Sequence, residues 1–147
     1  MNQILAKDLK FGLGSENTSK KYLEYVFGPL THTEDKFAKF DFYNENFKVE
    51  LKTRRCKFGQ YPDLYFEKGK LWEGVDWLKK NPEGRVIFIW RCIYDGWGRN
   101  GFVYWEYNED ELDFAWGGRD DRGKDEYKEL VAIKNKWIKK LFTLAPP

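Results

Sequence analysis

Three charged side chains lie on two neighbouring apolar runs and could together hold a metal ion. Asp41 lies in the first run, residues 37–43, and Glu50 and Lys52 lie in the second, residues 47–53. Side chains alternate between the two faces of a strand, so Glu50 and Lys52 share one face. If the apolar faces turn to the core, Asp41 converges with them on the opposite side. Two carboxylates and an ammonium can bind a divalent cation beside a positive charge, an arrangement suited to phosphodiester hydrolysis.

A β-hairpin must position these residues. The two runs are joined by Asn44-Glu45-Asn46, and an Asn-rich connection between apolar runs predicts a hairpin. In the first run Phe40 and Phe42 are expected on one face and Asp41 on the other. In the second run the apolar face is expected to hold Phe47, Val49 and Leu51.

The acidic-x-lysine pattern is common, so its context matters. It also occurs at Asp8/Lys10, Glu34/Lys36 and Glu126/Lys128. Only Glu50 and Lys52 lie inside an apolar run that directly follows another run with an isolated aspartate. The alternative interpretation is an ordinary amphipathic hairpin whose charged side chains face water.

Length and composition favour one ordinary domain and exclude several enzyme classes. The chain has 147 residues, of which 41% are hydrophobic and 19% aromatic, and we expect most rings in the core. His32 is the only histidine, which argues against His-ligated zinc enzymes and Ser-His-Asp hydrolases. Cys56 and Cys92 form no CxxC motif, so we expect reduced thiols in an intracellular protein. There is no P-loop, no GxGxxG motif and no transmembrane run, so neither a nucleotide cofactor nor a membrane is expected.

Charge is unevenly distributed although the net charge is only +2. One basic cluster surrounds the proposed site, a second lies near the end of the chain, and residues 106–126 are mainly acidic. The basic clusters consist of Lys48, Lys52, Arg54, Arg55 and Lys57, and of Lys134, Lys136, Lys139 and Lys140. Each cluster is either a binding surface for an anionic partner or a solvated face.

Hydrophobic periodicity and turn residues predict the other elements. A first helix begins near Ser15 and ends at Gly28-Pro29, and a second covers residues 70–80. The most apolar run, residues 85–94, predicts a central strand covered on both faces, with an antiparallel partner at 102–107. The remaining expectations are extended segments within 30–36 and at 64–66, 112–116 and 127–133, and a short helix at 135–141.

This order of elements, with Asp41 and the Glu50-Leu51-Lys52 triplet on the hairpin, resembles the PD-(D/E)XK nuclease superfamily. The resemblance implies an α/β (α+β) fold with a restriction-endonuclease-like αβββαβ core. A central mixed sheet would be flanked by helices, with a C-terminal strand and helix extension. The core would span about residues 11–107 of a single domain, 1–147, and the extension 108–147. The chain is most similar to small phage- or virus-encoded nucleases, although no proline precedes Asp41.

The resemblance implies a Mg²⁺-dependent DNA endonuclease in which Mn²⁺ can substitute. The expected metal ligands are Asp41, Glu50, the carbonyl of Leu51, and Glu16 at the start of the first helix, with Glu24 a weaker candidate. Lys52 would stabilise the attacking hydroxide or the transition state, and Gln60 would position phosphate or water. The expected contacts to the DNA backbone are Arg54, Arg55, Lys57 and Lys70.

Two other functions are compatible with the same residues. One is a catalytically inactive nuclease fold that binds nucleic acid or a protein partner. The other is an interaction protein with an aromatic contact surface. For the nuclease, the expected partners are DNA and a second copy of the chain, because a homodimer could cut two strands. The expected location is intracellular, in the cytoplasm, or in the host cytoplasm for a viral protein.

Overall fold

The computed structural model describes residues 18–33, 40–96, 101–117 and 128–144. Within these ranges, a larger sheet has six strands in the order β1-β2-β3-β5-β6-β9. Strands β3 and β5 are parallel, and every other neighbouring pair is antiparallel. The strands are β1 (Thr31–His32), β2 (Phe42–Tyr43), β3 (Phe47–Arg54), β5 (Arg85–Cys92), β6 (Phe102–Glu106) and β9 (Lys139–Lys140).

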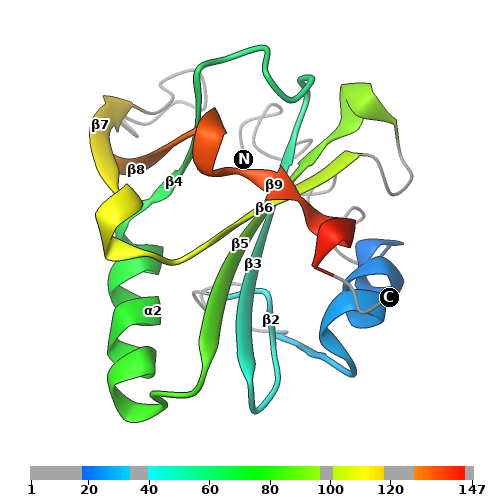
Figure 1. Ribbon diagram of the computed structural model, residues 1–147, viewed down its shortest axis with the longest axis vertical. Coiled ribbons are helices and arrows are strands. Elements are labelled where there is room, and N and C mark those ends of the chain that lie inside the picture. Colours follow the sequence, from blue (N-terminus) through cyan, green and yellow to red (C-terminus); the bar gives the residue numbers. More distant parts are fainter. Residues whose placement is uncertain (1–17, 34–39, 97–100, 118–127, 145–147) are drawn as a thin grey trace, which may run out of the picture.

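A smaller antiparallel sheet has the order β4-β8-β7 in the described residues. Its strands are β4 (Asp63–Glu67), β8 (Lys128–Lys134) and β7 (Asp113–Gly117). Two helices are described, an N-terminal helix over residues 18–27 and α2 (Lys68–Lys80). They lie on opposite sides of the central strands β3 and β5 (Figure 1). The 3₁₀ turns are η1 (Ile93–Asp95), η3 (Glu109–Glu111), η4 (Asn135–Trp137) and η5 (Leu141–Thr143).

Strand β5 separates two hydrophobic clusters, because its side chains alternate between the faces of the sheet. Ile87 and Ile89 pack with Leu23 and Phe27 of the N-terminal helix. The opposite face packs against α2 and the smaller sheet, through Val86, Phe88, Trp90 and Cys92. The prediction of a strand covered on both faces is therefore confirmed.

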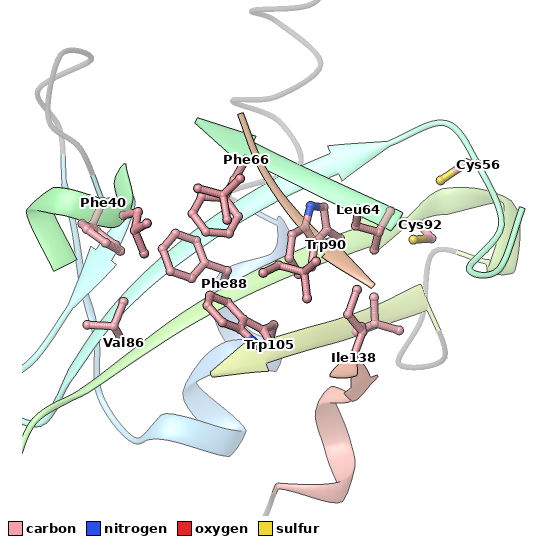
Figure 2. Packing of buried hydrophobic residues seen from close by; sticks show 14 residues of the cluster. Phe40, Cys56, Leu64, Phe66, Val86, Phe88, Trp90, Cys92, Trp105 and Ile138 are labelled. Atoms are coloured by element: carbon pink, nitrogen blue, oxygen red, sulfur yellow. The ribbon is translucent and has the colours of Figure 1, made fainter. Parts of the chain in front are cut away.

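Aromatic rings fill the cluster between the two sheets (Figure 2). Phe66 of β4 stacks on Phe88 of β5 with a centroid distance of 3.8 Å. The indole nitrogen of Trp90 donates a hydrogen bond of 3.1 Å to the carbonyl of Tyr65. This bond satisfies the one polar atom of a buried indole ring and ties β4 to the central sheet.

Helix α2 lies close to the central sheet because Gly74 faces β5. A Cβ atom at Gly74 would lie 3.0 Å from Cγ1 of Val86 and 3.3 Å from Cζ of Phe40. The helix ends where Asn81 donates its backbone N–H to the carbonyls of Trp77 and Leu78. The close approach fixes the first turn of α2, which carries Lys70, beside β3.

The prediction of a mixed α/β fold with a central mixed sheet and two helices is confirmed, but a predicted C-terminal helix at 135–141 is wrong. That segment contains η4, the short strand β9 and the start of η5. Ile138 is buried in the cluster that contains Phe88, whereas Leu141 is buried in the cluster that contains Ile87. The extended backbone between Ile138 and Leu141 pairs with β6, so one short segment serves both cores.

The expected orientation of Phe40 is also wrong. Phe42 is buried with Ile87, but Phe40 precedes β2 and packs on the other face against Phe88, with a centroid distance of 5.8 Å. The strict alternation of a strand therefore does not extend back to Phe40. Residues 34–39 and the start of the first helix lie outside the described residues. No helix among the described residues is long and apolar enough to cross a membrane.

Candidate carboxylate and lysine site

The register of the hairpin brings Asp41 and Glu50 opposite each other. Strands β2 and β3 pair Phe42 with Val49, and the next antiparallel step brings Asp41 opposite Glu50. Phe42 and Val49 are buried in the cluster next to the N-terminal helix. Glu50 alternates with Val49 and so lies on the opposite face, towards Lys70 of α2. Asp41 directly precedes β2, and its carboxylate lies close enough to Glu50 to act on its charge.

The turn residue Asn44 fixes this register. Its side-chain oxygen accepts hydrogen bonds of 2.9 Å from the backbone N–H groups of Asn46 and Phe47. Its side-chain nitrogen donates bonds of 3.1 Å to the carbonyls of Phe27 and Pro29. The hairpin is therefore attached to the end of the N-terminal helix, which limits slippage between β2 and β3.

Glu50 is a buried carboxylate that is only partly satisfied. The residue is 1% exposed and pairs in register with Phe88 of β5. One oxygen, Oε2, lies 2.9 Å from Nζ of Lys70 and 3.4 Å from Nζ of Lys52. The other, Oε1, has no hydrogen-bond partner among the described residues. A buried oxygen of this kind is costly unless a proton or a cation reaches it.

Asp41 supplies a second carboxylate beside Glu50. Its Oδ2 accepts a hydrogen bond of 2.8 Å from the backbone N–H of Leu51, which holds the side chain against β3. Burial and, to a smaller extent, the negative charge of Asp41 raise the pKa of Glu50 to about 8, although Lys52 and Lys70 act in the opposite direction. Two neighbouring carboxylates that share a buried space need a proton or a cation between them.

These donors fit a hard divalent cation. Carboxylate oxygens are the ligands that Mg²⁺ prefers, and Mg²⁺ keeps several water molecules when only one or two carboxylates bind it. The described residues contain no group of three acidic, histidine or cysteine side chains that could hold a metal. A cation at Asp41 and Glu50 would therefore use two protein carboxylates among the described residues.

Lys70 is the site residue whose position the sequence did not indicate. It was expected to contact the DNA backbone, but its Nζ lies nearer to Glu50 than that of Lys52. It comes from the first turn of α2, twenty residues after Glu50 in the chain. Spacing along the chain carries no signal for this contact, which depends on how α2 packs on the sheet.

The other predicted residues lie apart from the two carboxylates or outside the description. Gln60 is exposed and bonds within its own loop, accepting from the N–H of Lys57 at 3.1 Å and contacting the hydroxyl of Tyr61 at 3.3 Å. Arg54, the last residue of β3, is exposed, as are Arg55 and Lys57 just after it.

Two acidic candidates remain. Glu24 accepts the backbone N–H of Leu30 at 2.9 Å and so has a structural role at the end of the N-terminal helix. Glu16 lies outside the described residues. The expected role of the Leu51 carbonyl stays a prediction.

Comparison of the chain with models of protein families, with curated proteins and with solved structures found no match.

Proposed function

We propose that the chain is a Mg²⁺-dependent endonuclease that hydrolyses phosphodiester bonds of DNA. The observation that carries this proposal is the pair of carboxylates at Asp41 and Glu50, in which a buried oxygen of Glu50 lacks a partner among the described residues. The two lysines beside it would serve a reaction whose transition state gains negative charge.

The order of elements also supports the proposal. Along the chain, the N-terminal helix is followed by strands β1, β2 and β3 of the central sheet, and later by α2 and by β5 of the same sheet. This order resembles the αβββαβ core of the PD-(D/E)XK superfamily, with β4 assigned to the smaller sheet. Asp41 directly precedes the second of these strands and Glu50-Leu51-Lys52 lies within the third, as the resemblance implies.

Each residue would have a distinct role. Asp41 and Glu50 would hold the cation, which when bound lowers the pKa of a water molecule and neutralises charge on the phosphate. The Lys52 side chain is 22% exposed, so it can meet a substrate while staying near Glu50. Lys70, whose side chain is 16% exposed, would lower the pKa of Glu50 and hold its carboxyl group in place. Arg54, Arg55 and Lys57 would contact the DNA backbone without reading its sequence.

A cleavage assay tests the proposal. Supercoiled plasmid and a four-way junction would be incubated with the full chain in Mg²⁺, in Mn²⁺ and in EDTA. We expect metal-dependent cutting that Asp41→Asn and Lys52→Ala reduce by at least about 100-fold. Lys79→Ala, which removes an exposed lysine from the last turn of α2, is the matched control and should cut normally. Equal cutting by Lys52→Ala and wild type would contradict the assigned site.

A second function, that of an inactive nuclease fold which binds nucleic acid or protein, is favoured by one feature. The Nζ atoms of Lys70 and Lys52 lie 2.9 and 3.4 Å from Oε2 of Glu50, so this carboxyl group has cationic partners of its own. In that case Mg²⁺ would not change the thermal stability of the protein, and DNA binding would be the same in EDTA. A plasmid that stays intact under all conditions, together with such metal-independent binding, would favour this alternative over the nuclease.

A further inference from the structure

A groove of about 580 Å³ lies at the edge of the central sheet, next to β6 and η4, and has no part in the site described above. Its lining includes Trp105, Glu106, Tyr107, Lys136, Trp137 and Lys139. The volume lies within the range of ordinary ligand sites. The groove combines aromatic rings with lysines, and the charge that it presents decides which class of ligand fits it.

The acidic side chains of the groove already have partners. Glu106 forms hydrogen bonds of 2.6 and 3.0 Å with Arg85. Glu111 accepts from the indole nitrogen of Trp105 at 2.8 Å and from Asn108 at 3.2 Å. Neither Lys136 nor Lys139 forms an ion pair with another described residue. Arg85 neutralises Glu106, whereas Glu111 keeps its charge because both of its donors are neutral. The groove therefore presents the two lysines and one carboxylate, a net positive charge, to an anionic ligand.

Between Lys136 and Lys139 in the sequence is Trp137, whose ring lines the groove. Trp137 is 37% exposed, and Nζ of Lys136 lies 4.7 Å from its ring centroid. The ring is held in place because its turn is anchored, with Asn135 donating hydrogen bonds to the carbonyls of Tyr61 and Pro62. A partly exposed, anchored indole beside a lysine is a stacking platform for a flat base next to a phosphate.

Another part of the lining belongs to β6, whose edge away from β5 is open at Glu106 among the described residues. Strand β9 pairs only with Val103 and Tyr104 of β6. The N–H of Tyr107 points towards β5, where it bonds to the carbonyl of Val86, so by alternation the backbone of Glu106 faces the groove. This open edge is too short for a peptide to add as a strand, but one N–H and one C=O can meet the edge of a base.

The groove is also connected to the expected DNA-binding loop. The two hydrogen bonds from Asn135 attach η4 to the loop at Tyr61 and Pro62, a few residues after the exposed Lys57. Across the sheet, Glu50 is in register with Phe88, and Phe88 with Trp105. Two strand spacings, roughly 10 Å, therefore separate the backbone of Glu50 from that of Trp105 at one edge of the groove.

We propose that this groove binds a single-stranded segment of nucleic acid, with a base stacked on Trp137 and the phosphates at Lys136 and Lys139. The inference rests on the proposed function for the class of ligand, nucleic acid. It adds that the substrate has an unpaired stretch, as a flapped or gapped DNA does, because stacking on an indole requires a base that has left its duplex.

Binding to a fluorescein-labelled oligothymidylate of 12 nucleotides tests this inference. The full chain would carry Asp41→Asn, and EDTA would be present, so that no cleavage interferes. We expect Trp137→Ala to weaken binding about tenfold or more. The double variant Lys136→Ala/Lys139→Ala should also weaken binding and lower its salt dependence.

Two controls separate the groove from other surfaces. Trp116→Ala removes a tryptophan that is 75% exposed on β7 of the smaller sheet, and Lys79→Ala/Lys80→Ala removes two exposed lysines at the end of α2. Both should bind the oligonucleotide as the parent does. A poly-glutamate competitor of equal charge should displace the oligonucleotide only weakly, because it cannot stack.

The failure of this inference differs from the failure of the proposed function. Unchanged oligonucleotide binding in both groove variants, or equal displacement by poly-glutamate, would overturn the inference even if the wild-type chain cuts plasmid. Conversely, a chain that never cuts DNA but loses oligonucleotide binding in both groove variants would keep the groove and refute the nuclease. Lys136→Ala/Lys139→Ala changes only exposed side chains of the groove, so it tests the groove even if Trp137→Ala misfolds, and thermal unfolding of both variants would be recorded.

Discussion

Replacing Glu50 by glutamine should change how the stability of the metal-free protein depends on pH. The ordinary pKa of this carboxyl is 4.5, and in the folded chain burial and Asp41 raise it to about 8. Between these two values the folded protein holds a proton that the unfolded chain has released. Stability from this group is thus fully present below about pH 4.5 and is lost as the pH rises towards about 8.

The magnitude follows from the size of the pKa shift. Each pKa unit corresponds to about 1.4 kcal/mol, so a shift from 4.5 to about 8 corresponds to about 3–5 kcal/mol of unfolding free energy. Glutamine has a similar shape but does not ionise, so Glu50→Gln should lack this loss. The difference in pH slope is the informative quantity, because Glu50→Gln also removes the carboxyl group that Lys70 contacts, and this second effect is present at every pH.

Urea unfolding in EDTA, followed by tryptophan fluorescence between pH 5 and pH 9, measures this slope. Relative to wild type, Glu50→Gln should gain about 3–5 kcal/mol in unfolding free energy over this interval. Glu83→Gln removes an exposed carboxylate from the turn between α2 and β5, and it should follow the wild-type slope. If Glu50→Gln and wild type have the same slope, Glu50 is ionised throughout, and the argument from burial and Asp41 is refuted.

Three further predictions concern Lys70, the metal site and the buried thiol of Cys92. Lys70→Met should lower the unfolding free energy at pH 9 by about 1.5–3 kcal/mol, with a smaller effect at pH 5 where Glu50 is neutral, as urea titration at both values would show. Mg²⁺ at about 100 times its Kd should raise the unfolding free energy by about 2.7 kcal/mol, seen as a higher Tm that Asp41→Asn abolishes. Burial and the neighbouring Cys56 raise the pKa of the Cys92 thiol to about 12. This thiol should therefore react with a disulfide reagent at pH 8 only after the protein unfolds, as the absorbance of the released reagent would show. Fast reaction in the folded protein would contradict its burial.

The convergence of Asp41, Glu50 and Lys52 could be predicted because it depends on local rules. A hairpin with a short Asn-rich turn has a limited set of registers, and the two-residue period of a strand then decides which side chains share a face. The same rules failed at Phe40, which precedes β2 and packs on the other face of the sheet. Alternation applies only where the backbone is a paired strand.

Lys70 and the C-terminal segment could not be predicted because their positions depend on tertiary packing. Lys70 reaches Glu50 since Gly74 lets α2 lie close to Val86, and no spacing in the sequence encodes that approach. The segment 135–141 has helix-forming lysines, yet pairing with β6 and burial of Ile138 and Leu141 on different faces outweigh that propensity. The groove beside η4 follows from this second departure.

The features that make Glu50 costly in the metal-free protein are also those that would make it a metal ligand. A cation that binds Asp41 and Glu50 must displace the proton that the buried carboxyl retains, so metal affinity and proton affinity are linked. Since the pKa of Glu50 is about 8, Mg²⁺ affinity should rise with pH up to that region and then level off. Lys52 and Lys70 limit this competition, because they lower the pKa of Glu50 and so favour the ionised form that a cation requires. Two lysines beside the carboxylates therefore keep the pKa of a deeply buried glutamate low enough for a metal ion to compete with its proton.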